Sequence, residues 1–224
     1  MTLDLDSLRF DAVIFDLDGL LLDTERVGME AGIEALASLG HSVDDEIMRS
    51  LIGLDGPAGL ARLSAHLGVT LDPQATMSAW RQAMETRMTA GVPTMAHATE
   101  LLDRLHALGL PNAVATNSRT QGALTKIEAS ALAGRFEVVV GFDLVAAGKP
   151  APDVYLEAAR RLGINPARVL VFEDSDVGTR AGLAAGMTVV QVPDQLPSRE
   201  NAAHFTAETL HLGADWAGLW PARG

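Results

Sequence analysis

Two aspartates, Asp16 and Asp18, follow the apolar residues 13–15 and flank the start of a turn at Gly19. A short apolar run of this kind is typical of an interior strand of a parallel sheet, and the carboxyl end of such a strand is where α/β proteins place their chemistry. Charged groups seldom occupy the end of a buried strand unless they are paired or bind a ligand. The two carboxylates therefore indicate a functional site.

The Asp-x-Asp-Gly pattern has two other interpretations. It could form an ordinary turn, since aspartate and glycine both favour turns. It could also begin a calcium loop, but an EF-hand loop needs an oxygen ligand at its fifth position and glycine at its sixth, where this chain has Leu20 and Leu21. The calcium loop is excluded, and the other strand ends must decide about the turn.

A second group of polar side chains, Thr116, Asn117 and Ser118, follows an apolar strand predicted at 112–115. Asn117 or Ser118 as the cap of the next helix is the favoured interpretation of this segment by itself. A hydroxyl and the backbone amides of a helix start also suit a phosphate oxygen, so the segment has a second possible use.

Lys149 stands before Pro150 and is one of only two lysines in the chain, the other being Lys126. The residue before a proline is pushed away from helical geometry, so Lys149 is expected in an extended loop ahead of a helix. A solvated surface lysine is the alternative. A nucleotide P-loop is excluded, because Gly141 is too far upstream and Pro150 replaces the Ser or Thr that would hold magnesium.

A fourth strand end, after the apolar residues 169–172, carries the adjacent acids Glu173 and Asp174. Helix capping explains Ser175 or Asp176 but not these two. Clustered carboxylates without cysteine or a histidine pair suit a hard cation that prefers oxygen ligands. We therefore predict a Mg²⁺ site.

The elements that position these residues are of two kinds. From residue 24 to 90 the apolar residues recur at helical spacing, which predicts helices at 30–39, 44–51, 58–67 and 73–88. Beyond residue 93 short strands at 112–115, 138–140, 169–172 and 188–192 alternate with helices at 97–108, 120–131, 152–162 and 177–185. This order predicts an α/β fold, a Rossmann-like doubly wound parallel sheet, that an all-helical segment interrupts after the first strand.

The predicted domains are an α/β core formed by residues 1–23 and 92–224 and an inserted helical cap formed by residues 24–91. An insertion at this point would lie above the carboxyl end of the sheet and could act as a lid, with hinges near 23–25 and 91–93. At the other end of the chain, Trp216, Leu219 and Trp220 are expected to pack a last short helix on the core.

The composition excludes several classes of protein. The 29 acidic residues outnumber the 17 basic ones, and a formal net charge of −12 would repel nucleic acid. The absence of cysteine excludes disulfides and thiolate metal sites. The first ten residues contain acids and no long apolar stretch, so we expect neither a secretory signal nor a membrane anchor and predict a cytoplasmic monomer.

Together the four strand ends resemble the motifs of the haloacid dehalogenase superfamily. The matching segments are Phe-Asp-Leu-Asp-Gly at 15–19, Thr-Asn-Ser at 116–118, Gly-Lys-Pro at 148–150 and Glu-Asp-Ser at 173–175. The helical insertion resembles the small cap of the subgroup that contains β-phosphoglucomutase and many sugar-phosphate phosphatases. The resemblance extends over nearly the whole chain.

The resemblance implies a role for each matching residue. Asp16 would attack the phosphoryl group and form an aspartyl-phosphate. Asp18 would protonate the leaving alcohol and later take a proton from the attacking water. Thr116, the amide groups near Asn117, and Lys149 would bind the transferring oxygens.

The resemblance also implies a Mg²⁺ cofactor. Its ligands would be Asp16, the main-chain carbonyl of Asp18, and Asp174, with Glu173 acting directly or through water. Without that cation and Lys149, so many carboxylates at one edge of a sheet would repel each other strongly.

Several reactions occur in this superfamily. The dehalogenases lack the second aspartate of the first motif, so Asp18 favours phosphoryl transfer, and the phosphonate-cleaving relatives need a cap lysine that the insertion lacks. A mutase needs a histidine near the position of Gly28 and an arginine in the loop 53–57, and neither is present. We therefore predict a phosphatase, with a phosphosugar mutase as the alternative. A non-catalytic metal-binding or regulatory protein is a second alternative, which the presence of Asp16 and Lys149 disfavours.

The substrate is predicted only as a class, a small phosphomonoester such as a sugar or polyol phosphate. Phosphoglycolate and nucleoside monophosphates stay open. The candidates to contact its organic part are polar or aromatic residues of the insertion: Glu25, Arg49, Asp55 and Trp80, together with Arg26, Arg62 and Arg81.

Overall fold

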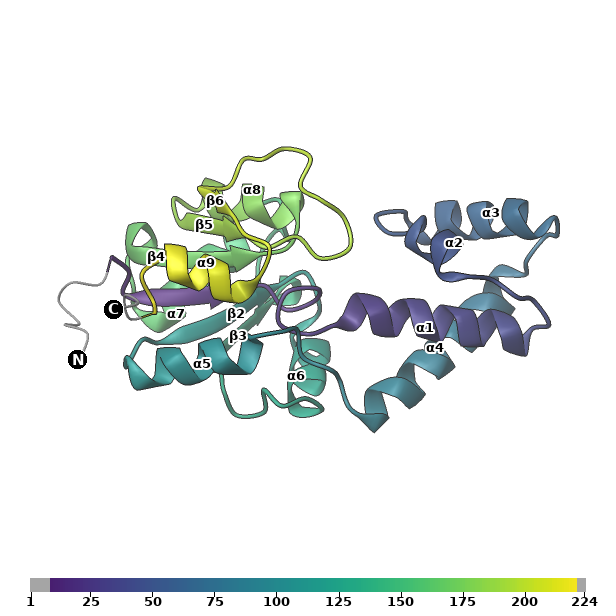
Figure 1. The fold of residues 1–224 in the computed structure, drawn as a ribbon, viewed down its shortest axis with the longest axis horizontal. Coiled ribbons are helices and arrows are strands. Elements are labelled where there is room, and N and C mark those ends of the chain that lie inside the picture. The colour runs from purple at the N-terminus through teal and green to yellow at the C-terminus, as the bar shows by residue number, and fades with distance from the viewer. Residues whose placement is uncertain (1–8, 221–224) are drawn as a thin grey trace. The chain divides into compact units, whose positions relative to one another are not determined.

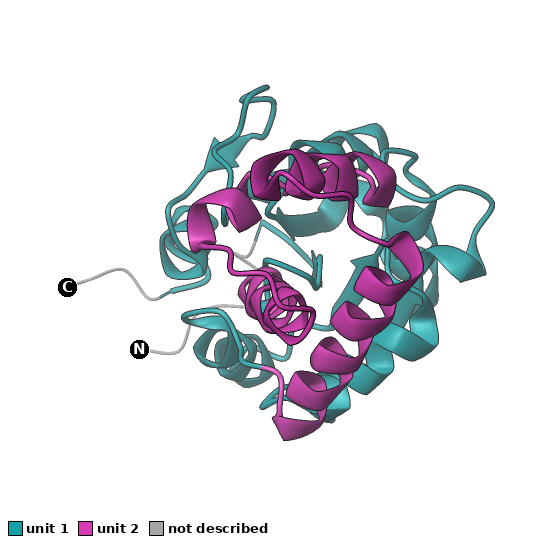
Figure 2. Cartoon of the chain, turned by 90° about the vertical axis from the view of Figure 1, so that its right-hand side faces the viewer, with its two compact units in different colours: residues 1–23, 93–224 teal, residues 24–92 magenta. Residues whose placement is uncertain are grey.

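The computed structural model describes residues 9–220, which form two compact units (Figure 2). One unit consists of residues 24–92, the insertion, and the other of the described residues on either side of it, the core. The boundary after Val92 falls one residue later than the predicted one. The structure does not describe residues 1–8 and 221–224. The prediction that they belong to the core, and the prediction that residues 1–10 form no signal or membrane anchor, therefore fall wholly or mostly outside the described residues.

The core is built on a parallel sheet of six strands in the order β3-β2-β1-β4-β5-β6 (Figure 1). The strands are β1 (Ala12–Phe15), β2 (Asn112–Thr116), β3 (Val138–Gly141), β4 (Val169–Glu173), β5 (Thr188–Gln191) and β6 (Phe205–Thr206). All residues of β1 and β4 are buried, as the central strands of a covered parallel sheet should be. The predicted α/β fold is confirmed. Strand β6 was not predicted, because two residues are too few for a recognisable pattern.

Helices and short 3₁₀ turns connect these strands. They are α5 (Ala98–Ala107), α6 (Thr120–Glu128), η2 (Phe142–Leu144), α7 (Asp153–Leu162), η3 (Pro166–Arg168), α8 (Asp176–Ala184) and α9 (Leu210–Trp216). Helix α6 ends three residues earlier than predicted. The reason is Ser130, whose hydroxyl donates to the carbonyl of Ile127 at 2.7 Å and accepts from the amide of Leu132 at 3.1 Å, an alternative to continued helix.

The register of the central strands brings the predicted site residues to one edge of the sheet. Phe15, the last residue of β1, lies opposite Phe172 of β4, and their rings stack with centroids 5.5 Å apart. Strand β2 pairs with the other side of β1 and ends at Thr116. Because all three strands are parallel, Thr116, Asp16 and Glu173 lie at the same carboxyl edge of the sheet, at the ends of the neighbouring strands β2, β1 and β4.

The chain leaves the core and returns to it at adjacent points. The amide of Asp23 donates to the carbonyl of Pro93 at 2.9 Å, and Leu22 pairs with Thr94 in an isolated antiparallel bridge. The two chain segments that connect the core to the insertion therefore lie side by side on the core, and their role as hinges stays a prediction.

The insertion contains the helices α1 (Thr24–Ser38), α2 (Asp45–Arg49), α3 (Gly56–Leu67) and α4 (Pro73–Ala90). Helix α1 begins six residues before the predicted one. Its buried face starts with Thr24 and Val27 and continues through the small residues Ala31 and Ala35, so its first turns give only a weak apolar signal. Within residues 9–220, no helix of either unit combines the length and the apolar character needed to cross a membrane.

The end of the chain packs partly as predicted. Leu219 is buried, but Trp216 is 36% exposed and stacks on Phe205 of β6, with ring centroids 5.0 Å apart. The last helix, α9, therefore lies on the core as predicted, but Trp216 contacts the unpredicted strand β6 at the surface and is not fully buried.

Candidate active site

Asp16 lies where β1 ends and the chain turns. Its amide donates to the carbonyl of Phe172 at 3.0 Å, which fixes it to the neighbouring central strand. The leucines at 17 and 20–22 are buried, and Gly19 adopts a φ of 80°, which permits the tight turn. The turn is thus anchored by apolar side chains on one side, while its aspartates line a cavity on the other.

A cavity of about 310 Å³ opens at this edge of the sheet and is formed entirely by the core. Its lining residues are Asp16, Asp18, Thr116, Asn117, Ser118, Lys149, Glu173, Asp174, Ser175 and Val177. All seven core residues that were predicted to act on phosphate or bind metal are among them. Four stretches of chain, far apart in the sequence, therefore converge on one cavity.

Lys149 joins two carboxylates in this cavity. Its Nζ forms ion pairs with Asp16 and, at 2.6 Å, with Glu173, and it lies 4.8 Å from the ring centre of Tyr155. Burial by itself lowers the pKa of Lys149, but the charges of Asp16 and Glu173 outweigh it and raise the pKa above its ordinary value. The interpretation of Lys149 as a solvated surface residue is therefore wrong, because its ammonium is buried between acids.

The carboxylate of Glu173 is fully buried and surrounded by protein donors. Oε1 accepts from Lys149 at 2.6 Å and from the hydroxyl of Tyr155 at 2.7 Å. Oε2 accepts from the amides of Asp174 and Ser175 at 3.1 and 3.2 Å and from the hydroxyl of Ser175 at 3.1 Å. Burial alone would raise the pKa of Glu173, but the charge of Lys149 and these hydrogen bonds hold it below its usual value. Both oxygens thus have protein partners, and contact of Glu173 with a metal, directly or through water, stays a prediction.

Helix α8 leaves room for this carboxylate by having glycine at position 178. A β-carbon on Gly178 would lie 1.7 Å from Oε1 of Glu173, well inside any tolerable contact. Neither Gly178 nor Tyr155 was among the predicted site residues. A glycine in the first turn of the helix that follows Glu173 and Asp174 could have indicated a close approach of another group to that helix. A single tyrosine among apolar residues, by contrast, is typical of an ordinary core position.

The cavity carries more negative charge than its cations balance. Burial raises the pKa of Asp16 to about 7 against the pull of Lys149, and the charges of Glu173 and Asp18 add to the rise. Burial also raises the pKa of Asp174 to about 9, with Asp16 and Glu173 adding to it. Several carboxylates crowded in one cavity, with oxygen as the only donor atom, fit a hard divalent cation such as Mg²⁺.

Asp18 pairs with a second cation, Lys126 of α6, which was not among the predicted site residues. The Nζ of Lys126 lies 2.5 Å from each carboxylate oxygen of Asp18 and 2.9 Å from the hydroxyl of Ser118, which itself donates to Asp18 at 2.7 Å. Side chains on a helix lean toward its amino end, which brings this ammonium back to the strand end that precedes α6. The rarity of lysine in the chain was the available signal.

Asn117 and Thr116 have side chains engaged within the protein. The amide group of Asn117 donates to the carbonyl of Lys149 at 3.1 Å and accepts from its amide at 2.8 Å. Gly148 permits this approach, since a β-carbon there would lie 2.7 Å from Oδ1 of Asn117. The hydroxyl of Thr116 accepts from the amide of Ser118 at 3.0 Å. The side chain of Asn117 thus positions Lys149, and phosphate binding at Asn117 stays a prediction.

In the insertion, two predicted substrate residues have structural roles. Asp55 caps α3 by accepting the amide three residues on at 2.8 Å. The indole of Trp80 packs in the insertion's apolar cluster and donates to the carbonyl of Gly28 at 3.1 Å. Glu25 lies in the first turn of α1, and Arg49 is exposed in the last turn of α2. Contact of these four residues with substrate stays a prediction.

Known proteins share this arrangement of sequence. Residues 13–192 match the family model of haloacid dehalogenase-like hydrolases. The chain is 33% identical to the fructose-1-phosphate phosphatase YqaB of Escherichia coli K12, over 82% of this chain and 97% of that protein. It is 30% identical to the phosphorylated carbohydrates phosphatase of Thermotoga maritima, over 79% of this chain and 82% of that protein.

A solved structure agrees with these relatives. The HAD family hydrolase of Deinococcus radiodurans R1, crystallised with bound phosphate and sodium, is 32% identical and superposes with a TM-score of 0.83 over 97% of this chain and 100% of that one. The resemblance drawn from the four strand ends is confirmed, and the prediction of an enzyme that hydrolyses phosphoric monoesters agrees with the names of both curated relatives. The chain belongs to the haloacid dehalogenase-like hydrolases.

Proposed function

We propose that this chain is a Mg²⁺-dependent phosphatase that hydrolyses small phosphomonoesters, sugar or polyol phosphates in particular, through an aspartyl-phosphate at Asp16. The observation that carries the proposal is the pairing of each motif aspartate with its own lysine. Lys149 pairs with Asp16, and Lys126 pairs with Asp18. Two carboxylates held apart in this way suit two different tasks, attack on phosphorus and transfer of a proton. The names of the relatives, which include fructose 1-phosphate and phosphorylated carbohydrates, support the substrate class.

In the first step an oxygen of Asp16 forms a bond to phosphorus while the bond from phosphorus to the ester oxygen breaks. The strand end and Lys149 hold this carboxylate at the cavity. Lys149 is also the cation available to offset charge on the transferring oxygens, and the main-chain amide of Asn117 and the hydroxyl of Thr116 are the neighbouring groups for the same oxygens. Splitting the displacement into two steps lowers the barrier of each.

The proton is the task of Asp18. It donates a proton to the departing alcohol oxygen, and in the second step it accepts one from the water that attacks the aspartyl-phosphate and releases phosphate. Lys126 and Ser118 fix its carboxylate by hydrogen bonds from α6 and from the end of β2. We assign both residues a positioning role for Asp18.

Mg²⁺, when bound, supplies positive charge against the phosphoryl oxygens and the clustered carboxylates. The carboxylates of Asp16 and Asp174 and the main-chain carbonyl of Asp18 would hold it, with Glu173 behind a water molecule. The raised pKa values of Asp16 and Asp174 support this assignment, because a divalent cation would replace the protons that these groups otherwise retain.

The proposal is tested by phosphate release from a panel of about a hundred phosphorylated metabolites, with and without EDTA, alongside isomerisation of β-glucose 1-phosphate. We expect Mg²⁺-dependent release from sugar or polyol phosphates. Acid-quenched enzyme should carry label from a ³²P-substrate, and Asp16→Asn enzyme should carry none. Isomerised product without free phosphate would instead establish the mutase, and a panel without any turnover would leave the non-catalytic alternative.

A further inference from the structure

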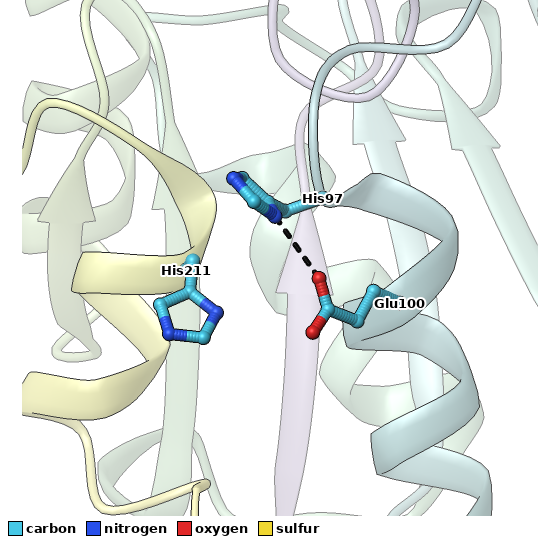
Figure 3. Close-up of side chains that lie close together, drawn as sticks. All are labelled: His97, Glu100 and His211. Atoms are coloured by element: carbon cyan, nitrogen blue, oxygen red, sulfur yellow. Dashed lines mark hydrogen bonds and ion pairs between the residues drawn. The ribbon is translucent and has the colours of Figure 1, made fainter.

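A cluster of two histidines and a glutamate lies in the core outside the cavity described above. His97 precedes α5, Glu100 lies in its first turn, and His211 lies in the first turn of α9. One ligand atom from each of the three side chains lies within 4.8 Å of the other two. Figure 3 shows the three side chains facing one another across the gap between the two helices. None of them lines the phosphatase cavity.

The backbone and the neighbouring rings hold these side chains in place. His97 adopts a φ of 67°, a left-handed conformation that costs free energy for a residue other than glycine. From there its Nδ1 lies 3.0 Å from the carboxylate of Glu100. The ring of His211 lies 5.3 Å from that of His97 and 5.0 Å from the indole of Trp220, on which it stacks. The imidazole of His211 is thus confined between two rings.

One polar atom of this cluster is buried without satisfaction. Nδ1 of His211 has no hydrogen-bond partner among the residues that the structure describes. In Figure 3 the ring nitrogen next to the point of attachment, which is Nδ1, is turned toward Glu100. A buried polar group without a partner destabilises the folded protein, so a ligand that bound Nδ1 of His211 would satisfy an atom that the described residues leave unpaired.

We propose that His97, Glu100 and His211 bind one divalent transition-metal ion of the zinc type. Two imidazole nitrogens and one carboxylate oxygen are a donor set that Zn²⁺ accepts, whereas Mg²⁺ prefers oxygen alone. Ligand atoms about 2.1 Å from a tetrahedral ion stand about 3.4 Å apart, so side chains now within 4.8 Å need only small rotations to close on it. His97 and Glu100 are exposed and have room for that movement.

Three protein ligands leave one of four positions for water or another small ligand. The site differs from the Mg²⁺ site in donor type, and its ligands come from α5 and α9 rather than from strand ends. Its immediate consequence is mechanical, because a metal ion here would tie the last helix of the described chain to α5. Binding to the folded state alone raises its stability in proportion to the logarithm of the free metal concentration.

The test is zinc binding by the full chain without an affinity tag, measured by competition with a chromophoric chelator in millimolar Mg²⁺, which occupies the phosphatase site. We expect wild-type protein to bind one equivalent that His211→Phe, Glu100→Gln and His97→Asn lose, with affinity lower by about 100-fold or more. Phenylalanine keeps the ring stacking at position 211, and asparagine tolerates the left-handed backbone at position 97. His106→Asn, an exposed histidine on the same helix, should bind as wild type does.

Thermal unfolding supplies a second readout. Zinc should raise the Tm of wild-type and His106→Asn protein with increasing concentration, and it should leave the Tm of Glu100→Gln unchanged. Equal melting without metal verifies that each variant folds, and Glu100→Gln decides the test if a histidine variant does not. Equal zinc stoichiometry in wild type and in Glu100→Gln, or no zinc bound by wild type, would overturn the proposal.

Discussion

The core cavity and the helical insertion use the same kinds of side chain in opposite ways. In the core, Asp16 ends a strand, is buried, and pairs with a lysine from a distant loop. In the insertion, Asp55 begins a helix, is exposed, and accepts the amide three residues on. The first interaction connects separate parts of the chain around a cavity, whereas the second only helps its own helix to form.

This difference agrees with the two tasks that we propose, the reaction at phosphorus in the core and recognition of the organic part of the substrate by the insertion. Charged groups that act on phosphorus are costly to bury and must be held by several partners, so the protein holds them in position even without substrate. Groups that select among sugars need only reach the substrate when it is present. If the contrast is correct, substitutions in the core cavity should have larger effects than substitutions in the insertion.

The largest effect is expected from Asp16→Asn, which keeps the shape of the side chain and removes the nucleophilic oxygen. Turnover of any phosphomonoester should fall by about 10³-fold or more, since we propose the carboxylate of Asp16 as the nucleophile that forms the covalent intermediate. Steady-state kinetics with protein verified by circular dichroism measures it. Turnover within a few fold of wild type would assign the attack to another group and remove the main distinction between core and insertion.

Two glycine substitutions compare packing in the two units directly. Gly178→Ala in α8 places a β-carbon on the carboxylate of Glu173 and should destabilise the protein by about 2–3 kcal/mol. Gly59→Ala in α3 meets nothing within 4 Å and should stabilise its helix by about 0.5–1 kcal/mol. Chemical denaturation measures both, and equal effects of the two substitutions would contradict the picture of a closely fitted core.

Lys126→Met should lower kcat by about 10–100-fold for a sugar phosphate, because Asp18 loses the cation that holds its carboxylate. The loss should be smaller for p-nitrophenyl phosphate, whose leaving group departs readily without a proton. A matched loss for both substrates would mean that Lys126 serves the fold or the phosphate and not the proton transfer. Arg180→Met, whose partner Glu200 lies on the surface, is the control for removing a paired cation.

The contrast between Lys149 and Lys126 marks how much of the site could be predicted. Lys149 was predicted because its local sequence, a lysine before proline, already fixes the backbone, and the strand-end motifs are local in the same sense. Lys126 and Tyr155 act from helices, and which residue of a helix reaches a strand end depends on how the helix packs. The α/β order could be predicted because short apolar runs are also a local signal. Strand β6 and the start of α1 depend instead on packing against distant residues, so the sequence pattern did not predict them.

Stability should depend on pH in the metal-free protein. The pKa values of Asp16 and Asp174, about 7 and 9, exceed the value of about 3.9 in an unfolded chain, so between these values the folded state holds more protons. The stability that these protons contribute is fully present below about pH 4, falls as pH rises above that value, and is lost once pH has passed about 7 for Asp16 and about 9 for Asp174. Lys149 opposes both shifts, while Glu173 and Asp18 face the same cavity and add to the repulsion.

In EDTA we therefore expect a lower Tm at pH 9 than at pH 6, and a smaller difference in Mg²⁺, which would take the place of the protons. Differential scanning calorimetry at the two pH values measures it. The variant that carries both Asp16→Asn and Asp174→Asn removes the titrating groups and should show a flatter profile. An unchanged slope in that variant would place the pH dependence elsewhere in this acidic chain.

The smallest effect is expected in the insertion. Asp55→Ala removes the cap of α3 and should cost about 1 kcal/mol of stability, while Asp55→Asn, which still caps, should cost little. If Asp55 serves only its helix, kcat/KM for a sugar phosphate should stay within about twofold of wild type in Asp55→Asn, because the cap is preserved. A loss of kcat/KM in Asp55→Asn without loss of stability would mean that this carboxylate touches substrate after all. In that case residues of the insertion would bind the organic part of the substrate, as we propose that the residues at the strand ends bind the phosphoryl group.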